Sequence, residues 1–402
     1  MRLPASQSMV GLLRSAIDLA VFPFLMAVLA LLWLPLRVRR AWRRAHGHPP
    51  IIVWGPVPSI ASPHWVDAVR EAGYPAWTVV YAHDRLGHPG LFDYYMPHFF
   101  RGPSRALMPY ATFLWVLCWA DVFHVFCDVS GFLGPTSYRF LELPILRCFG
   151  KRVVAYCFGT DVQRASVIQG RYRYSIAPWA PTGERERAVL GNIQHTLRYA
   201  DYVIAGADNF VFFPRYDLCA QMAAIDLTRI RPSYPHPRVG APIRVVHAPN
   251  HRHLKGTEHV IRACDQLRVE GLPVELQLVE GVRNDLAVEL YREADIVVDQ
   301  LIIGAYGLFA IEAMALGKPV VCHLHEDAIA ANIGWGECPI VNADPDTIVD
   351  VLRGLLAHPE RLPALGRAGR AYVEKYHSYK YIGGLFDGVY RRLWGSGNPI
   401  HQ

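Results

Sequence analysis

The chain has 402 residues, of which 52% are hydrophobic, 12% aromatic and only 19% charged. This composition predicts buried cores in about two domains and excludes a disordered chain. The formal net charge of +6 comes from residues 1–44, which hold seven arginines and one acid, Asp18. The rest of the chain is neutral, which gives no support to a nucleic-acid-binding surface.

The N-terminal segment is apolar and then basic. Residues 19–36, LAVFPFLMAVLALLWLPL, carry no charge and precede the cluster RVRRAWRR. Eighteen apolar residues are about the minimum for a membrane span, and an arginine cluster where a signal peptide has its small-residue cleavage site argues against a signal peptide. We therefore expect residues 1–48 to be a membrane anchor with a basic flank whose C-terminal side faces the cytoplasm. Pro23 and Pro35 leave open whether the helix spans the membrane or only dips into it, and a buried helix of a soluble protein is the third alternative.

The eight cysteines are scattered, without a C-x-x-C pair. This usage is typical of reduced thiols that act as small core residues. It agrees with catalytic domains on the cytoplasmic side of a cell membrane.

Short apolar strands alternate with helices after the anchor, which predicts a parallel sheet covered on both faces. A helix is expected over residues 62–73, with Ser62 as its N-cap. The aromatic segment 92–126 predicts an apolar helix followed by a strand. The other strands of this half are expected at residues 50–57, 75–82 and 200–207, and within residues 151–161, where a strand enters a glycine turn.

A proline-rich stretch at residues 214–241 interrupts this rhythm and indicates an inter-domain linker. A second alternating series follows it, with the spacing of a doubly wound domain. Two amphipathic helices are expected over residues 367–394. We expect an anchor at 1–48, one domain at 49–230, another at 231–375 and a C-terminal helix at 376–402.

Ligands bind beyond the carboxyl ends of the strands in such sheets. The loop HAPNHRHLKGT follows one predicted strand and offers Arg252 and Lys255 just before a helix, an arrangement that suits a phosphate or diphosphate. By itself it is equally well explained as a solvated basic loop. The loop VEGVRND, with Glu280 and Gly281, is better explained as a plain turn.

The third such loop opens the stretch GAYGLFAIEAMALGKPVV. Gly304 and Gly307 let the backbone approach a ligand, and the free amides around Gly307 and Leu308 suit an anion. Glu312 lies about one turn further, where a carboxylate can accept hydrogen bonds from sugar hydroxyls. Considered alone, a glycine turn and an exposed acid on an ordinary amphipathic helix explain this stretch better.

Three histidines near the first of these loops, His247, His251 and His253, raise the question of a metal site. No cysteine or carboxylate stands in register with them, so ordinary loop residues are the better interpretation.

The ordered set of HAPNHRHLKGT, ADIVVDQL and GAYGLFAIEAMALGKPVV resembles the nucleotide-sugar-binding domain of family 4 glycosyltransferases, which have the GT-B fold of two Rossmann-like domains facing a cleft. The resemblance is strongest over residues 243–323 and extends over residues 49–393. It is weaker in the first domain, at HVFCDVSG, GKRVVAYCFGTDV and ADYVIAGADNFVFF. In this family the last helix returns to the first, acceptor-binding domain.

The resemblance implies transfer of a sugar from a nucleoside diphosphate, typically with retention of configuration and without a metal. Lys255, with Arg252, would bind the donor diphosphate. The amides near Gly307 and Leu308 would hold the distal phosphate, and Glu312 matches the family acid that binds the nucleotide ribose. Cations and helix dipoles would stabilise the leaving diphosphate.

Two departures from the family pattern stand out. Gly304 occupies the position of a first glutamate that contacts the transferred sugar, and Phe158 precedes the first-domain glycine where a histidine is common. Asp161 and Asp299 are the nearest acids that could compensate, although each could also cap a local turn. The candidate residues are therefore Asp161 and Asp299 for catalysis and Arg252, Lys255, Gly304, Tyr306, Gly307, Leu308 and Glu312 for donor binding, with no metal ligand and no cofactor besides the nucleotide-sugar donor.

These residues predict a membrane-associated glycosyltransferase of polysaccharide or glycolipid synthesis, with a lipid-linked acceptor. The two departures favour an alternative, a nucleotide-binding subunit that has lost catalysis. A nucleotide-sugar 2-epimerase on the same fold is a third possibility, but an epimerase needs no membrane anchor.

Overall fold

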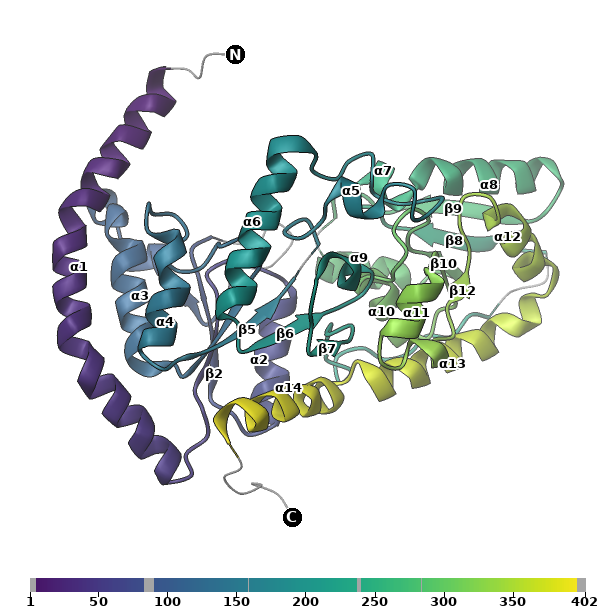
Figure 1. Ribbon diagram of the computed structural model, residues 1–402. Helices are drawn as coiled ribbons and strands as arrows, with labels where there is room; N and C mark the ends of the chain where they lie inside the picture. The colour runs from purple at the N-terminus through teal and green to yellow at the C-terminus, as the bar shows by residue number, and fades with distance from the viewer. Residues whose placement is uncertain (1–4, 83–89, 158, 237–239, 283, 396–402) are drawn as a thin grey trace. The chain divides into compact units, whose positions relative to one another are not determined.

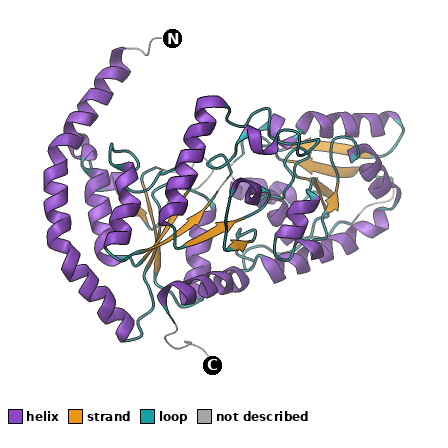
Figure 2. Cartoon of the chain, in the orientation of Figure 1, coloured by secondary structure: helices purple, strands orange, loops and turns teal. Residues whose placement is uncertain are grey.

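The computed structural model describes residues 5–82, 90–157, 159–236, 240–282 and 284–395. Two parallel sheets carry the helices (Figures 1 and 2), and this confirms the predicted α/β architecture. The chain divides into two compact units. Unit 1 comprises Met1–Val162, Ala188–Ile204 and Gly383–Gln402, and unit 2 comprises Gln163–Arg187 and Ala205–Ile382.

The first sheet has the strand order β3-β2-β1-β4-β5-β6-β7. Its central strands are short and almost wholly buried, as expected of a parallel sheet covered on both faces. The two edge strands are only two residues long, too short to give a sequence signal. The strands are β1 (Ile52–Trp54), β2 (Ala76–Val80), β3 (Tyr94–Tyr95), β4 (Val122–Phe126), β5 (Arg152–Tyr156), β6 (Tyr202–Ala205) and β7 (Leu218–Cys219).

Helices connect these strands. The N-cap predicted for the first helix after α1 is wrong. The helix α2 begins at Ala61, and Ser62 is not its N-cap. The Ser62 hydroxyl lies inside the first turn and donates to the Ser59 carbonyl at 2.9 Å. The helices of this part of the chain are α1 (Ala5–Ala45), α2 (Ala61–Glu71), α3 (Met108–Trp119), α4 (Glu142–Cys148), α5 (Ala165–Ile168) and α6 (Gly183–Tyr199).

α1 carries the apolar N-terminal segment. Within the described residues, Arg14–Ala45 is the one helix that is long and apolar enough to cross a membrane. It belongs to unit 1 and lies beside α3 and α4 of that unit (Figure 1). The expected membrane segment is therefore a continuous helix, and Pro23 and Pro35 lie within it.

The second sheet has the order β12-β11-β10-β8-β9 and lies in unit 2. Successive residues of its strands face opposite cores, as the period of two requires. In β8, Val245 packs with the helices α8 and α12, and Val246 packs on the other face with α9, α10 and α13. The strands are β8 (Ile243–His247), β9 (Val274–Leu278), β10 (Ile296–Val298), β11 (Val320–Cys322) and β12 (Val341–Asn342).

The helices of the second series follow the expected alternation, and the two C-terminal helices are also present. They are α7 (Arg252–Lys255), α8 (Thr257–Val269), α9 (Asn284–Tyr291), α10 (Leu308–Ala315), α11 (Glu326–Ala331), α12 (Ile348–Ala357), α13 (Leu362–Tyr376) and α14 (Tyr379–Trp394).

The order of the second sheet reverses between β8 and β10. β9 continues from β8 on one side, while β10, β11 and β12 are added on the other. The connections leaving β8 and β10 therefore diverge, and a crevice forms at their carboxyl ends. His247 and Val298 are partners across these two strands, so the residues that follow each are brought together.

Candidate functional site

Lys255 lies at the crevice beyond β8. It ends the short helix α7, and Gly256 then adopts a left-handed conformation with φ of 73° before α8 begins. The Lys255 ammonium donates to the Asp299 carboxylate at 2.7 Å and to the side-chain oxygen of Gln300 at 2.6 Å. Both partners directly follow β10, so this cation is held at the point where the strand order reverses.

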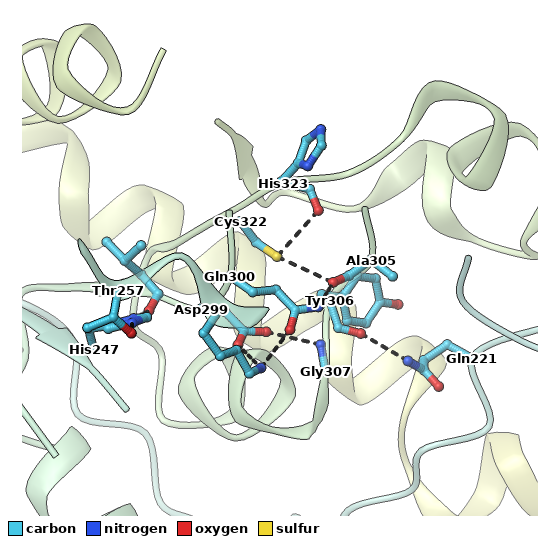
Figure 3. A network of polar contacts seen from close by, with 12 residues as sticks. Gln221, His247, Thr257, Asp299, Gln300, Ala305, Tyr306, Gly307, Cys322 and His323 are labelled. Atoms are coloured by element: carbon cyan, nitrogen blue, oxygen red, sulfur yellow. Dashed lines mark hydrogen bonds and ion pairs between the residues drawn. The ribbon is translucent and has the colours of Figure 1, made fainter. Parts of the chain in front are cut away.

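Asp299 also binds the N-terminus of α10. Its second carboxylate oxygen accepts the Gly307 amide at 3.0 Å (Figure 3). A Cβ at Gly307 would lie 3.8 Å from the Lys255 nitrogen, so the lysine and the helix N-terminus converge within van der Waals contact. The first amides of α10 have no intrahelical acceptor and carry the positive end of the helix dipole. The arrangement can hold a phosphate group.

His247, at the end of β8, has a structural role. Its ring nitrogens lie 2.8 Å from the Val298 carbonyl and 2.9 Å from the Thr257 hydroxyl, so both are used (Figure 3). Burial lowers the pKa of His247 to about 4, which keeps the ring neutral beside Lys255. The ring thus fixes the start of α8 relative to β10.

Arg252, the second predicted phosphate ligand, is more exposed than Lys255. Its guanidinium contacts Glu258 at 3.0 Å and Glu280 at 3.2 Å. Glu280 lies in the loop after β9, which sequence alone explained as a plain turn. The structure brings that loop to the same end of the sheet through this ion pair.

Gly304 is covered by an imidazole. The backbone amide of His325 donates to the Gly304 carbonyl at 3.0 Å, and a Cβ placed on Gly304 would overlap the His325 ring. That ring is buried, stacks on Tyr172 with centroids 3.6 Å apart, and has a nitrogen 3.3 Å from the Tyr174 carbonyl. The space that a side chain at position 304 would fill is therefore taken by His325.

Tyr306 lies in the core rather than in the crevice. Its ring is buried, and its hydroxyl lies 2.9 Å from the Tyr372 hydroxyl and 3.1 Å from a nitrogen of His377. Its backbone carbonyl accepts the Gln221 amide at 3.0 Å (Figure 3). The side chain therefore anchors the loop before α10, and only the backbone of Tyr306 is at the crevice edge.

Glu312 is in the second turn of α10, and its side chain is buried. Burial and then the charge of Glu312 raise the pKa of Tyr291, so the carboxylate lies near that ring. Leu308 is the first residue of α10. Sequence therefore placed both residues in the correct helix, but it did not show that the acid is buried.

Asp161 belongs to unit 1 and accepts two backbone amides. Its carboxylate oxygens receive the Gly159 amide at 2.9 Å and the Cys127 amide at 3.2 Å. These bonds join the turns that follow β5 and β4. Phe158, which stands where a histidine is common in the family pattern, lies outside the described residues.

Sequence reasoning missed Gln300 and His325. Gln300 binds Lys255 and also donates to the Ala305 carbonyl, so it links the cation to the loop before α10 (Figure 3). The sequence did carry a signal for Gln300, because it is a polar residue directly after Asp299 at the end of a buried strand. His325 gave a weaker one, because the run HLH after β11 could equally be a solvated turn.

A cavity of 630 Å³ adjoins this histidine, and all of it lies in unit 2. One wall is the segment 171–174, and the others are the turns after β11 and β12. Aromatic rings, arginines and acids alternate around it, a lining that suits polar ligands better than apolar ones. Among its residues are Tyr172, Tyr174, His323, His325, Asp327 and Asn342.

Parts of the chain are similar in sequence to known transferases. No protein-family model matches it. It is 29% identical over 167 residues to MMP alpha-(1->4)-mannosyltransferase of Mycolicibacterium hassiacum, covering 35% of this chain and 40% of that protein. It is 35% identical over 97 residues to D-inositol 3-phosphate glycosyltransferase of Segniliparus rotundus, covering 22% of this chain and 20% of that protein. The chain thus spans well under two thirds of the length of these relatives.

Solved structures resemble the chain over most of its length. Sucrose-phosphate synthase from Thermosynechococcus elongatus has a TM-score of 0.56 at 15% identity, covering 86% of this chain and 99% of that one. HepE of Anabaena, in complex with UDP-glucose, has a TM-score of 0.53 at 12% identity, covering 85% and 99%. At these identities the likeness shows the fold alone. The predicted GT-B fold and the resemblance to family 4 glycosyltransferases are both confirmed.

Proposed function

We propose, from the GT-B fold and the resemblance to family 4 glycosyltransferases, that this chain transfers a sugar from a nucleoside-diphosphate donor to an acceptor. The observation that carries the proposal is that Asp299 binds the Lys255 ammonium at 2.7 Å and the Gly307 amide at 3.0 Å, which holds the lysine beside the N-terminus of α10 at the strand-order reversal of unit 2. An ammonium and free helix amides bind the oxygens of a diphosphate and stabilise it as a leaving group.

The donor site consists of the residues around this convergence. Lys255 and Arg252 contact the diphosphate, and the amides at Gly307 and Leu308 hold its distal phosphate. Glu312 accepts the ribose hydroxyls. HepE, of the same fold, is described in complex with UDP-glucose, which supports a nucleotide sugar as the donor.

Asp161 and Asp299 remain the candidate catalytic acids, but their bonds favour positioning roles. Asp299 is fully buried and is shared between Lys255 and Gly307. Its carboxylate thus fixes the ammonium next to the helix N-terminus. Asp161 in the same way joins two turns of unit 1.

The acceptor and the location follow from the N-terminal helix. α1 exposes large apolar side chains and ends among arginines, which supports attachment to the cytoplasmic face of a cell membrane. An enzyme held at this surface meets lipid-linked acceptors of polysaccharide or glycolipid synthesis. We propose that the transfer retains configuration, as the resemblance to family 4 glycosyltransferases implies. We also propose that it needs no metal, because Lys255 and the helix dipole provide the positive charge.

Incubation of the purified full chain with labelled nucleotide sugars and a membrane lipid extract tests this function. We expect label in the lipid fraction with at least one common donor. Free-nucleotide binding is measured on the same preparation. Absence of both binding and transfer contradicts the proposal.

A non-catalytic nucleotide-binding subunit is the second candidate. The His325 ring over Gly304 favours it, because an acid at position 304 would not fit there. Tight nucleotide binding without any transfer or donor hydrolysis would identify this alternative.

A further inference from the structure

α1 packs against the rest of unit 1 along a single stripe of side chains. Over residues 14–45, where the side chains of α1 are described, the buried ones are Asp18, Leu25, Leu29 and Leu36, which recur at the seven- and four-residue spacing of one helix face. The stripe therefore extends from one end of the apolar segment to the other. A helix that left the protein to cross a bilayer would contact it at one end only.

The N-terminal end of the stripe is held by polar bonds. The Asp18 carboxylate accepts the Ser137 amide at 2.8 Å and hydroxyl at 2.6 Å, and it also accepts the Tyr110 hydroxyl. Burial raises the pKa of Asp18, but the bonds from Ser137 and Tyr110 outweigh it and lower the pKa below its ordinary value. Asp18 is thus a charged group bound by unit 1 rather than one facing lipid.

The C-terminal end of the apolar segment is bound as well. The Trp33 indole and the Arg37 guanidinium both donate to the Cys148 carbonyl, at 3.2 and 2.9 Å. Six residues on, Arg43 pairs with the buried Asp121 at 3.4 Å. Both ends of the apolar segment are therefore tied to the body of unit 1.

The opposite face of α1 is apolar and exposed. Leu31 is 77% exposed and Phe24 is 70% exposed. Exposed apolar side chains continue along the whole segment and beyond it, and such a large patch marks an interaction surface. They are Leu19, Phe24, Met26, Leu31, Leu34, Val38 and Trp42.

We infer that α1 lies in the plane of a phospholipid bilayer surface, with unit 1 on one side and its exposed face in the acyl chains, and that it does not span the membrane. From Asp18 to Arg43 a helix extends about 38 Å, more than the hydrocarbon thickness of about 30 Å. If α1 spanned the bilayer, the loops of unit 1 bound to it would lie in hydrocarbon, which irregular backbone does not tolerate. Arg44 is exposed near the C-terminal end of α1 and suits anionic headgroups.

This inference rests on the proposed membrane attachment and specifies its geometry. Topology tests it directly. The full chain carries a protease-cleavable epitope at its N-terminus and a second one at its C-terminus, and cleavage is scored in vesicles of both orientations. We expect both epitopes on the same side of the membrane. Epitopes on opposite sides would overturn the inference, while transferase activity could persist.

Substitutions on the exposed face test the bound surface. Leu31→Glu and Phe24→Glu should each weaken co-sedimentation with phosphatidylcholine–phosphatidylglycerol vesicles about tenfold or more, because each removes a large apolar side chain from the lipid. The matched control is Val269→Glu in unit 2, where the wild-type side chain is 89% exposed, and it should bind as the wild type does. Thermal stability should be unchanged in all three variants.

Two results would contradict the lipid assignment. One is vesicle binding that is unaffected by both substitutions. The other is a wild-type chain that does not bind vesicles and forms a dimer in solution, which Leu31→Glu dissociates. The exposed face would then bind a second copy of the chain. Nucleotide binding, measured in each variant, should not change, so failure here is distinguishable from failure of the proposed transferase function.

Discussion

At the scale of single residues, the site depends on one buried ion pair. Lys255 is 13% exposed and Asp299 is fully buried, and they lie 2.7 Å apart. Such a pair adds little net stability, but losing one partner leaves a buried charge without compensation. The pair instead fixes the position of an ammonium beside the N-terminus of α10. In the proposed donor site, this ammonium is already oriented for a diphosphate.

We predict that Lys255→Ala weakens binding of a nucleoside diphosphate about 10- to 100-fold, because a charge-assisted hydrogen bond contributes about 1.5–3 kcal/mol. It should also lower the free energy of unfolding by about 3–5 kcal/mol, since Asp299 is left uncompensated. Calorimetric titration and urea unfolding measure the two effects.

The double variant Lys255→Ala/Asp299→Asn separates these two effects. It should regain most of the stability and none of the affinity. Arg268→Ala is the control, because its ion pair with Asp265 is exposed on α8. Full nucleotide affinity in Lys255→Ala would exclude this lysine from the donor site.

The second prediction at the scale of single residues concerns Gly304. Gly304→Glu should lower the melting temperature and fail to raise transfer, because its Cβ would overlap the His325 ring. Gly354→Ala in α12 is the matched control, since its Cβ would meet no atom within 4 Å. That change should be neutral or stabilising by up to about 1 kcal/mol.

Adding His325→Ala should relieve part of the loss in Gly304→Glu. Differential scanning calorimetry of the single and double variants measures this coupling. Equal melting temperatures for Gly304→Glu and the wild type would show that the imidazole moves aside freely.

At the scale of elements, the segment 171–174 has a regular pattern of contacts. Each Arg-Tyr pair of the sequence RYRY binds one aspartate. Arg171 and Tyr172 bind Asp327 at 2.8 and 2.7 Å. The next pair, Arg173 and Tyr174, binds Asp346 at 2.8 and 2.7 Å. The segment is thus bound at two points, to the first turn of α11 and to the turn that follows β12.

Asp327→Ala should therefore loosen this segment and raise the rate of tryptic cleavage at Arg171, because the guanidinium and the Tyr172 hydroxyl lose their shared acceptor. Timed proteolysis followed by mass spectrometry measures the rate. Asp265→Ala, which removes an exposed acid from α8, should leave the rate at the wild-type value. An unchanged rate in Asp327→Ala would mean that Asp346 alone holds the segment.

At the scale of the whole molecule, buried histidines give the stability of unit 2 a pH dependence. Burial lowers the pKa of His247, His325 and His377 to about 4 each. Between about pH 6.5 and 4 the unfolded chain binds protons that the folded chain excludes, so stability falls as the pH falls through this window. In unit 1, burial lowers the pKa of one histidine, His124, well below its ordinary value, and it raises the pKa of Glu142 to about 7, so that protonation of Glu142 does not oppose folding in acid.

We therefore predict that unit 2 loses protection before unit 1 as the pH is lowered from 6.5 to 4.5. Hydrogen exchange read by mass spectrometry reports the two units separately. His377→Gln should reduce this pH dependence, because it removes one of the three groups. Equal sensitivity of both units would show that these histidines do not govern it.

The sequence alone indicated the alternation of strands and helices, the GT-B fold and the loops that meet at the carboxyl ends of β8 and β10. The alternation and the loops follow from local patterning, because apolar periodicity and glycine positions depend on neighbours in the chain, whereas the GT-B fold was implied by the resemblance to family 4 glycosyltransferases. Lys255 and Gly307 were selected for the same reason. The two-residue strands β3, β7 and β12 gave no pattern and were missed.

Only the tertiary structure decided which groups face each other across the sheet. The sequence could not show that Asp299 binds Lys255, that His325 covers Gly304, or that Tyr306 turns into the core, because each contact joins residues that the strand order brings together. It likewise left open how α1 meets a membrane. Its hydropathy is set by composition, whereas its orientation depends on the stripe from Asp18 to Leu36 that unit 1 binds.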